Sequence, residues 1–369
     1  MILQADPGRS FKMLEQEIRT AANKVFESGW YILGKENEKF ENAFAGYNQS
    51  QYCLGTANGT DSIELILRAL NIGCNDLVAT VGNTATATVS AIERTGAKVR
   101  FADIEPGKFT MSAASLETLL MREPGIKAVV VVHLFGAAAD MEPLLEVARK
   151  HNVYLIEDCA QAHGAEYNGK KCGTFGIAGS FSFYPTKNLG AFGDGGAVIT
   201  NDPDLYEKMV AIRQYGWKKR YISEFTGINS RLDEIQAAIL SVKLPFLDAN
   251  NDKRRKIAAS YKEGLKEIKE ILLPLEPEDT RHVYHQFVIC VAKEKRAELM
   301  SYMKENGIGC AIHYPVAIPL QPGYEKIPHI CDLSETLRVN DTIMSLPMYP
   351  ELTDEEVERI ISVLRGFFI

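Results

Sequence analysis

The chain has 369 residues, of which 46% are apolar and 24% charged, and its formal net charge is −7. This length predicts a globular protein with two domains, or with one large domain and a smaller appendage. The acidic balance argues against a nucleic-acid-binding protein, because such binding depends on basic side chains that neutralise phosphates. The N-terminal segment lacks a secretory pattern and no apolar run approaches about 18 residues, so we expect a cytoplasmic protein that does not span a membrane.

Cysteine and histidine spacing gives no indication of a metal site. The seven cysteines are scattered without a C-x-x-C pair, and the seven histidines include no H-E-x-x-H pattern. Isolated cysteines in an odd number are typical of reduced thiols. The basic run at residues 253–256 has acidic and apolar neighbours at helical spacing, so we interpret it as an exposed turn of a surface helix.

The first half of the chain predicts an α/β fold. Two helices are expected at the start, over residues 11–29 and 36–48. Short apolar segments typical of buried strands then alternate with helical segments. The expected strands are 52–57, 77–81, 98–104, 127–135, 153–160, 179–184 and 196–201, and the helices between them are 61–70, 86–96, 115–121 and 141–151. This alternation predicts a mainly parallel sheet that helices cover on both faces.

The second half predicts a smaller α+β domain. The pattern is helical between residues 204 and 250, and Pro245 is expected to bend the chain. A helix (253–268), a strand (285–292), a helix (295–307), further short strands and a last helix (354–368) follow. We therefore expect a large domain at residues 1–247, with the N-terminal helical segment, and a small C-terminal domain at residues 248–369.

Two charged residues follow neighbouring strands of the expected sheet, where ligands of such sheets collect. Asp158 ends a very apolar strand, although a lone aspartate there is more often a cap or turn residue. Lys187 lies in a glycine-bounded loop after Ser182 and Tyr184, where a lone lysine more often reaches the surface. Together they favour pyridoxal phosphate, whose aldehyde forms an imine with a lysine that then acts as a base.

A phosphate site is predicted where the first strand runs into a helix. Asn58, Gly59 and Thr60 stand at this helix start, and free N–H groups there favour an anion. Ser182 is a second candidate donor. Simple helix capping by Asn58 or Thr60 explains the same motif about equally well.

These residues belong to a set of motifs that covers essentially the whole chain. The set resembles the DegT/DnrJ/StrS sugar aminotransferases. It comprises residues 28–34, 40–41, 58–61, 158–164, 182–187, 193–196, 227–233, 236–238, 313–315 and 346–347. The resemblance implies a fold-type I pyridoxal-phosphate-dependent transferase with active sites at the interface of a homodimer.

The resemblance also implies roles for single residues. Lys187 would form the imine and Asp158 would pair with the ring nitrogen, and these two would be the catalytic residues. Gln161 would bond to the ring hydroxyl oxygen. His163 would lie beside the ring, although a structural histidine is nearly as plausible.

The phosphate and substrate contacts follow in the same way. Gly59, Thr60 and Ser182 would hold the phosphate, and Asn229 would reach it from the partner subunit. The nucleotide-linked substrate would contact Tyr31, Tyr184, Lys219, Arg220, His313 and Tyr314. The basic residues at 218–220 suit a diphosphate, or form an exposed basic loop.

One feature departs from the family pattern. Many members place an aromatic residue over the cofactor ring in the loop after the second strand, but this chain has Asn83, Thr84, Ala85 and Thr86 there. The resemblance therefore leaves the residue that covers the ring face unassigned.

Within the family, the segments at 83–88 and 215–221 look most like those of enzymes that make nucleotide-linked 3-amino-3,6-dideoxyhexoses. The expected reaction moves an amino group from L-glutamate to C3 of a dTDP-linked 3-keto-6-deoxyhexose in deoxyamino sugar biosynthesis. The cofactor would alternate between its pyridoxal and pyridoxamine forms. Two alternatives stay open: transfer to C4, and a non-catalytic regulator that binds the cofactor. A dehydratase of the same fold is disfavoured, because relatives that deoxygenate the sugar are expected to lack the imine lysine, and this chain has Lys187. A Rossmann dehydrogenase is disfavoured because no G-x-G-x-x-G follows the first strand.

Overall fold

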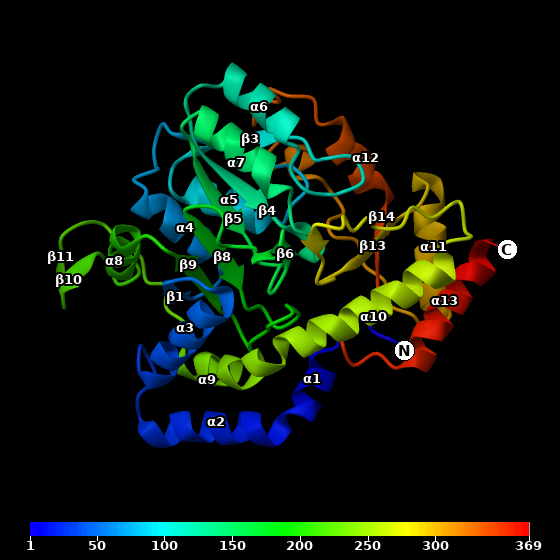
Figure 1. The fold of residues 1–369 in the computed structure, drawn as a ribbon, viewed down its shortest axis with the longest axis horizontal. Coiled ribbons are helices and arrows are strands. Elements are labelled where there is room, and N and C mark those ends of the chain that lie inside the picture. Colours follow the sequence, from blue (N-terminus) through cyan, green and yellow to red (C-terminus); the bar gives the residue numbers. More distant parts are fainter. Residues whose placement is uncertain (369) are drawn as a thin grey trace.

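The computed structural model describes residues 1–368 and is built around one seven-stranded sheet (Figure 1). The strand order is β1-β9-β8-β5-β4-β2-β3. In chain order these strands are β1 (Tyr52–Thr56), β2 (Leu77–Val81), β3 (Lys98–Ala102), β4 (Ile126–Val132), β5 (Tyr154–Asp158), β8 (Ala178–Ser182) and β9 (Gly196–Thr200). Within this sheet β9 runs antiparallel to both neighbours and the other six strands are parallel to one another. The predicted α/β fold with a mainly parallel sheet is confirmed.

Helices cover both faces of the sheet, which explains the continuous apolar run of β4. Ala128 and Val130 pack into one core, whereas Val129 and Val131 pack into another. The first core lies under α4 (Gly59–Ala69), α5 (Thr86–Arg94) and α8 (Pro203–Ile212). The second lies under α6 (Ala113–Arg122) and α7 (Met141–Lys150).

The N-terminal segment forms three helices, α1 (Pro7–Met13), α2 (Glu15–Ser28) and α3 (Lys35–Asn48). The prediction of one continuous helix over residues 11–29 is therefore wrong. Asp6 caps α1 by accepting from the amides of Gly8 and Arg9, and Pro7 stands at its first position. Leu14 then leaves the helical conformation, with φ −128°, and separates α1 from α2.

The chain continues through α9 (Glu234–Lys243), a 3-10 turn with Pro245 (Leu244–Phe246) and the long helix α10 (Leu247–Leu265). Figure 1 shows α10 running away from the sheet toward the C-terminal elements. These are β13 (Phe287–Cys290), α11 (Lys293–Glu305), α12 (Ser334–Thr342), β14 (Ile343–Leu346) and α13 (Asp354–Phe368). Side chains of α10, α11, α13 and both strands share a separate core. The division at residue 247 stays a prediction.

The basic run of α10 is only partly exposed, which corrects its interpretation as a solvated turn. Arg254 is buried and donates to the carbonyl oxygens of Tyr284 and Met348. Its guanidinium therefore joins α10 to two C-terminal segments. Arg255 forms an ion pair with Glu276.

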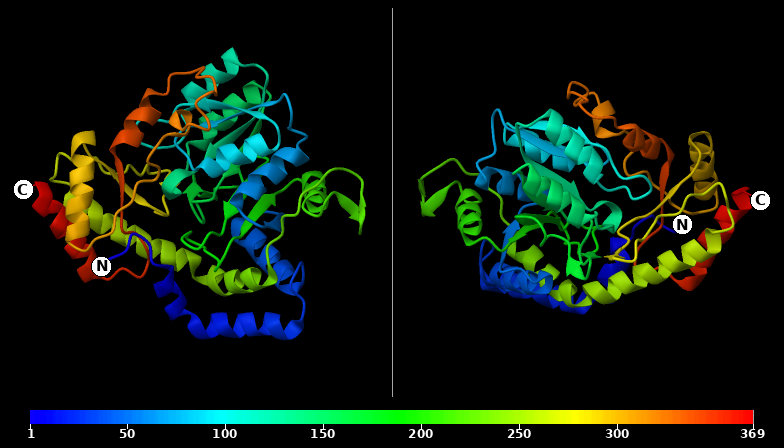
Figure 2. Two further views of the ribbon diagram at one scale, coloured as in Figure 1. Left: turned by 180° about the vertical axis from the view of Figure 1, so that it is seen from behind. Right: turned by 45° about the horizontal axis from the view of Figure 1, so that its top comes forward.

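Smaller elements complete the fold. They are β6 (Glu166–Tyr167), β7 (Lys170–Lys171), β12 (Thr280–Arg281), two 3-10 turns (Leu134–Gly136 and Ile318–Leu320), β10 (Trp217–Lys219) and β11 (Ile222–Ser223). The hairpin of β10 and β11 projects from the body of the molecule in both Figure 1 and Figure 2. Over the described residues, no helix combines the length and the apolar character that a bilayer crossing requires.

Candidate active site

A cavity of about 290 Å³ opens at the carboxyl ends of the parallel strands. Its walls come from the segments that follow β1, β2, β4, β5 and β8, which converge at this edge because the strands are parallel. Seven of the residues expected at the site line it: Gly59, Thr60, Asp158, Gln161, Ser182, Tyr184 and Lys187. Residues up to 128 positions apart in the chain, from Gly59 to Lys187, therefore lie together at this edge of the sheet.

Asp158 is the last residue of β5 and is only 5% exposed. Its Oδ1 accepts from the amide of Ala160 at 3.1 Å, and its Oδ2 accepts from the Thr88 hydroxyl at 2.8 Å. Burial raises the pKa of Asp158, while these two hydrogen bonds and the positive charge of Lys187 oppose the rise. A buried carboxylate held in this way suits a cationic partner inside the cavity.

Lys187 lies in the tight loop that joins β8 to β9. Its amide donates to the Tyr184 carbonyl oxygen at 2.8 Å, and a side chain at Gly190 would collide with the carbonyl oxygen of Pro185. Burial lowers the pKa of Lys187 to about 8, against the opposing charge of Asp158. The lysine therefore gives up its proton more easily than a solvated lysine does.

Gly59 and Ser182 form the part of the cavity that suits a phosphate. A Cβ on Gly59 would lie 2.8 Å from the Cβ of Ser182, so only glycine lets the start of α4 approach β8 this closely. Asn58 caps α4 by accepting from the Asp61 amide at 2.8 Å, which leaves the amides of Gly59 and Thr60 without a bond in this cap. The amides of Gly59 and Thr60, with the hydroxyls of Thr60 and Ser182, are therefore a favourable set of donors for an anion.

Gln161 has a defined orientation in the cavity. Its Oε1 accepts from the Phe135 amide at 2.7 Å, so its Nε2 donates to the Tyr314 hydroxyl at 3.1 Å. Tyr314 comes from the C-terminal part of the chain, and His313 lies next to it. Burial, and then the charge of Lys187, lowers the pKa of His313 to about 4. Two residues expected to contact the substrate therefore lie beside the cavity.

His163 has a different environment from the other expected residues. It is fully buried and packs against Phe181 and Phe183, with ring centroids 5.5 and 5.8 Å away. Both ring nitrogens lack a hydrogen bond of good geometry to the described residues, and burial lowers the pKa of His163 to about 3. The imidazole is therefore a neutral member of a buried aromatic cluster.

Four other expected residues lie outside this cavity. Tyr31 and Asn229 are exposed, as are Lys219 and Arg220 in the hairpin of β10 and β11. The guanidinium of Arg220 lies 4.9 Å from the ring centre of Tyr221. A single subunit therefore does not bring these residues to its own Lys187.

Several residues that shape the cavity had no predicted role. Thr88 holds Asp158, and Ala85, Leu134 and Asp194 belong to the wall. From the segment that follows β2, only the small residues Thr84, Ala85 and Ala87 line the described cavity. Thr88 lies in the first turn of the helix that follows β2, and this place near a strand end marks it as a candidate site residue.

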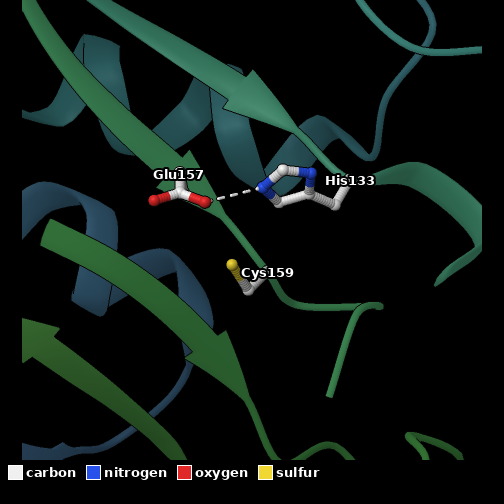
Figure 3. A group of neighbouring side chains, drawn as sticks. All are labelled: His133, Glu157 and Cys159. Atoms are coloured by element: carbon white, nitrogen blue, oxygen red, sulfur yellow. Dashed lines mark hydrogen bonds and ion pairs between the residues drawn. The ribbon is translucent and has the colours of Figure 1, made fainter. Parts of the chain in front are cut away.

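A second buried cluster, of His133, Glu157 and Cys159, lies beside the cavity (Figure 3). Its spacing would suit a metal ion, but the ligand atoms of Glu157 and His133 are already engaged in hydrogen bonds. Glu157 accepts from the amides of Gly173, Phe175 and Gly176 at 2.7–2.8 Å, and from His133 Nε2 at 3.0 Å. His133 Nδ1 accepts from the Ala139 amide at 3.0 Å. We interpret the cluster as a hydrogen-bond network that holds the loop before β8.

Solved structures similar to this chain include proteins named as aminotransferases. The chain superposes on S. venezuelae DesV in complex with a ketimine intermediate with a TM-score of 0.95, at 38% identity, covering 100% of this chain and 98% of that one. It also superposes on NtdA from Bacillus subtilis with bound cofactor PMP, with a TM-score of 0.89 at 29% identity, covering 96% and 81% of the two chains. The fold and the cavity therefore define an aminotransferase.

The family follows from the sequence comparison. The model of the DegT/DnrJ/EryC1/StrS aminotransferase family matches residues 12–365, and the chain belongs to this family. A dTDP-3-amino-3,6-dideoxy-alpha-D-galactopyranose transaminase from Aneurinibacillus thermoaerophilus is 44% identical over 96% of both chains. A pleiotropic regulatory protein from Geobacillus stearothermophilus is 40% identical over 98% of this chain and 97% of its own.

Proposed function

We propose that the protein is a pyridoxal-phosphate-dependent nucleotide-sugar aminotransferase that moves the amino group of L-glutamate to C3 of a dTDP-linked 3-keto-6-deoxyhexose. The observation that carries this proposal is the pairing of Lys187, with its lowered pKa, and buried Asp158 in one cavity. The choice of C3 and of a dTDP-sugar is supported by the 44% identical relative, whose name specifies both.

The residues of the cavity fit the cofactor. The close approach of Gly59 to Ser182 forms a cradle of amides and hydroxyls for the phosphate. Asp158 offers a buried carboxylate to a protonated ring nitrogen, and Gln161 Nε2 has a second N–H for the ring hydroxyl oxygen. Lys187 provides the amine. Each polar part of pyridoxal phosphate thus has a complementary group in the chain.

Asp158 and Lys187 have separate roles in the proposed reaction. When bound, the cofactor supplies an electron sink for the carbanion at the α-carbon of the amino donor. The Asp158 carboxylate keeps the ring nitrogen protonated, which that sink requires. With a pKa of about 8, Lys187 is neutral in roughly a tenth of the molecules at pH 7. In the first half-reaction its Nζ accepts the proton from the donor's α-carbon, and in the second half-reaction it delivers a proton to the sugar carbon that receives the amine.

The remaining expected residues support a homodimer with shared sites. Asn229, Lys219 and Arg220 are exposed and lie away from the cavity of their own chain. Asn229 is suited to reach the phosphate of the partner's cofactor, and the two basic residues suit the diphosphate of the partner's substrate. Tyr31, which is also exposed, would join that contact surface.

A regulator without turnover is the second candidate, because one relative is named a pleiotropic regulatory protein. Such a protein would need a cofactor site but no base with a lowered pKa. Lys187 therefore favours the enzyme. Transfer to C4 of a 4-keto-6-deoxyhexose remains the alternative regiochemistry.

The test is incubation of the purified protein with [15N]glutamate and a panel of 3-keto and 4-keto nucleotide sugars, with mass spectrometry and NMR as readouts. We expect 15N at C3 of a dTDP-linked 6-deoxyhexose. Labelled nitrogen at C4 would overturn the regiochemistry. No labelled sugar from any keto-sugar, despite bound cofactor, would favour the regulator.

A further inference from the structure

The hydrogen bonds around Asp158 assign a function to a residue with no expected role. Thr88 is fully buried in the first turn of α5, which begins at Thr86. Its Oγ1 lies 2.8 Å from Asp158 Oδ2 and 3.0 Å from the Oγ1 of Thr84. Thr84 in turn lines the cavity. The two threonines thus form a chain of hydroxyls that runs from the cavity wall to the carboxylate.

The direction of this chain follows from the number of protons. An ionised carboxylate only accepts hydrogen bonds, so the single proton of the Thr88 hydroxyl must point to Asp158. Thr88 can then only accept from Thr84, whose proton is fixed as well. Protonation of Asp158 at Oδ2 would make it the donor and would reverse both hydrogen bonds of this chain. The arrangement is therefore complementary to the ionised form of Asp158.

Asp158 has few hydrogen-bond donors other than Thr88. Oδ1 accepts from the Ala160 amide, and the residue is 5% exposed, so water is largely excluded. A hydrogen bond to a buried charge is stronger than one between neutral groups, and its loss is correspondingly costly. The first turn of α5 adds the positive end of a helix dipole beside the same carboxylate.

We propose that Thr88 is a positioning residue, oriented by Thr84, that keeps Asp158 ionised and aimed at the ring nitrogen of the cofactor. This inference rests on the proposed function, because it assumes that the cavity holds a pyridoxal-type cofactor. It goes beyond that function by naming the group that sets the charge state of Asp158. Thr88 itself touches neither cofactor nor substrate.

The test measures the dissociation constant of pyridoxamine 5′-phosphate by calorimetry between pH 5 and 9. This probe has no aldehyde, so its binding does not depend on a bond to Lys187. In Thr88→Val we expect binding to weaken about tenfold at pH 7, and the acidic loss of affinity to begin about one pH unit higher than in the wild type. Thr88→Ser, which keeps the hydroxyl, should follow the wild type.

A second comparison separates this role from a merely structural one. Thr86→Val makes the same change in the same helix at an exposed residue, and should leave the affinity unchanged. In an Asp158→Asn background, Thr88→Val should change the affinity less than twofold, because the charge that Thr88 serves is gone. Thr88→Ala replaces the valine variant if that variant does not fold.

These measurements test the role of Thr88 separately from the proposed function. Wild-type affinity in Thr88→Val, an equal loss in Thr88→Ser, or full additivity with Asp158→Asn would each overturn the role of Thr88 and leave the proposed function intact. A wild-type protein that binds neither pyridoxamine phosphate nor pyridoxal phosphate would overturn the proposed function, and this inference with it.

Discussion

The hydroxyl of Tyr314 accepts a hydrogen bond from Gln161 Nε2 at 3.1 Å, which joins the C-terminal part of the chain to the loop after β5. The other end of the same amide is fixed, because Gln161 Oε1 accepts from the Phe135 amide. Asn340 Nδ2 donates to the carbonyl oxygen of Tyr314 and fixes the backbone of the tyrosine. The amide that we assign to the cofactor's ring hydroxyl is thus oriented before the cofactor binds.

Tyr314→Phe should therefore weaken pyridoxamine phosphate binding about fivefold, because one hydrogen bond that orients Gln161 contributes about 1 kcal/mol. Calorimetry measures the effect, and Tyr324→Phe is the matched control. In a Gln161→Leu background the tyrosine change should have no further effect. A loss that persists there would show that Tyr314 acts independently of Gln161.

Lys187→Met should stabilise the cofactor-free protein at neutral pH, because folding buries an ammonium whose pKa falls from 10.5 to about 8. Between these values the unfolded chain binds more protons than the folded one, so the stability of the wild type rises with pH. After allowance for the partial exposure of the side chain, we expect a gain of about 1–2 kcal/mol at pH 7 that disappears above about pH 10.5.

Urea unfolding at several pH values measures this gain, with the exposed Lys253→Met as the control. The same mutant should lose all turnover. An equal or lower stability of Lys187→Met at pH 7 would contradict the view that the lysine is held in an unfavourable charge state.

His163→Phe should leave cofactor binding within about threefold of the wild type, because the ring sits among Phe181 and Phe183 rather than on the cavity wall. The pKa of about 3 means that the unfolded chain gains a proton near pH 6.5 that the folded one does not. This residue therefore makes the protein lose stability as the pH falls below 6.5.

Urea unfolding at pH 7 and pH 4.5 isolates that contribution as the difference between the variant and the wild type. The variant should lose less stability than the wild type over this range. A loss of cofactor of tenfold or more in His163→Phe would instead support the position beside the ring that the family resemblance implies.

The shared site can be tested by mixing two inactive variants, Lys187→Ala and Asn229→Asp. If Asn229 serves the partner's cofactor, each mixed dimer holds one site with both residues intact, and random exchange should restore about a quarter of the wild-type activity per subunit. If Asn229 serves its own chain, every site in the mixed dimer lacks one residue. Activity no greater than that of the parents would then contradict the shared site.

Much of the cavity could be predicted because it depends on strand ends. Asp158, Gly59 and Ser182 each stand at or just after the end of a parallel strand, and a parallel sheet brings such ends together whatever the side-chain packing. The role of each residue toward a cofactor came from the family motifs, since spacing alone left caps and turns as alternatives.

Several contacts depend on packing that the sequence does not reveal. Thr88 bonds to Asp158, which is 70 residues away in the sequence, and this contact depends on the rotamer of Thr88. Tyr314 bonds to Gln161, which is 153 residues away, and this contact depends on where the C-terminal segment packs on the sheet. Arg254 was taken for a surface residue because its partners are backbone carbonyl oxygens, which have no sequence pattern. The break at Leu14 was missed because the apolar periodicity continues across it.

Borohydride reduction of the purified protein, followed by peptide mass spectrometry, determines whether Lys187 carries pyridoxal phosphate. We expect a yellow protein that loses its visible band on reduction, and a cofactor-derived mass increment on the peptide that contains Lys187. An increment on any other lysine, or a colourless protein that remains unmodified after addition of the cofactor, would contradict this expectation.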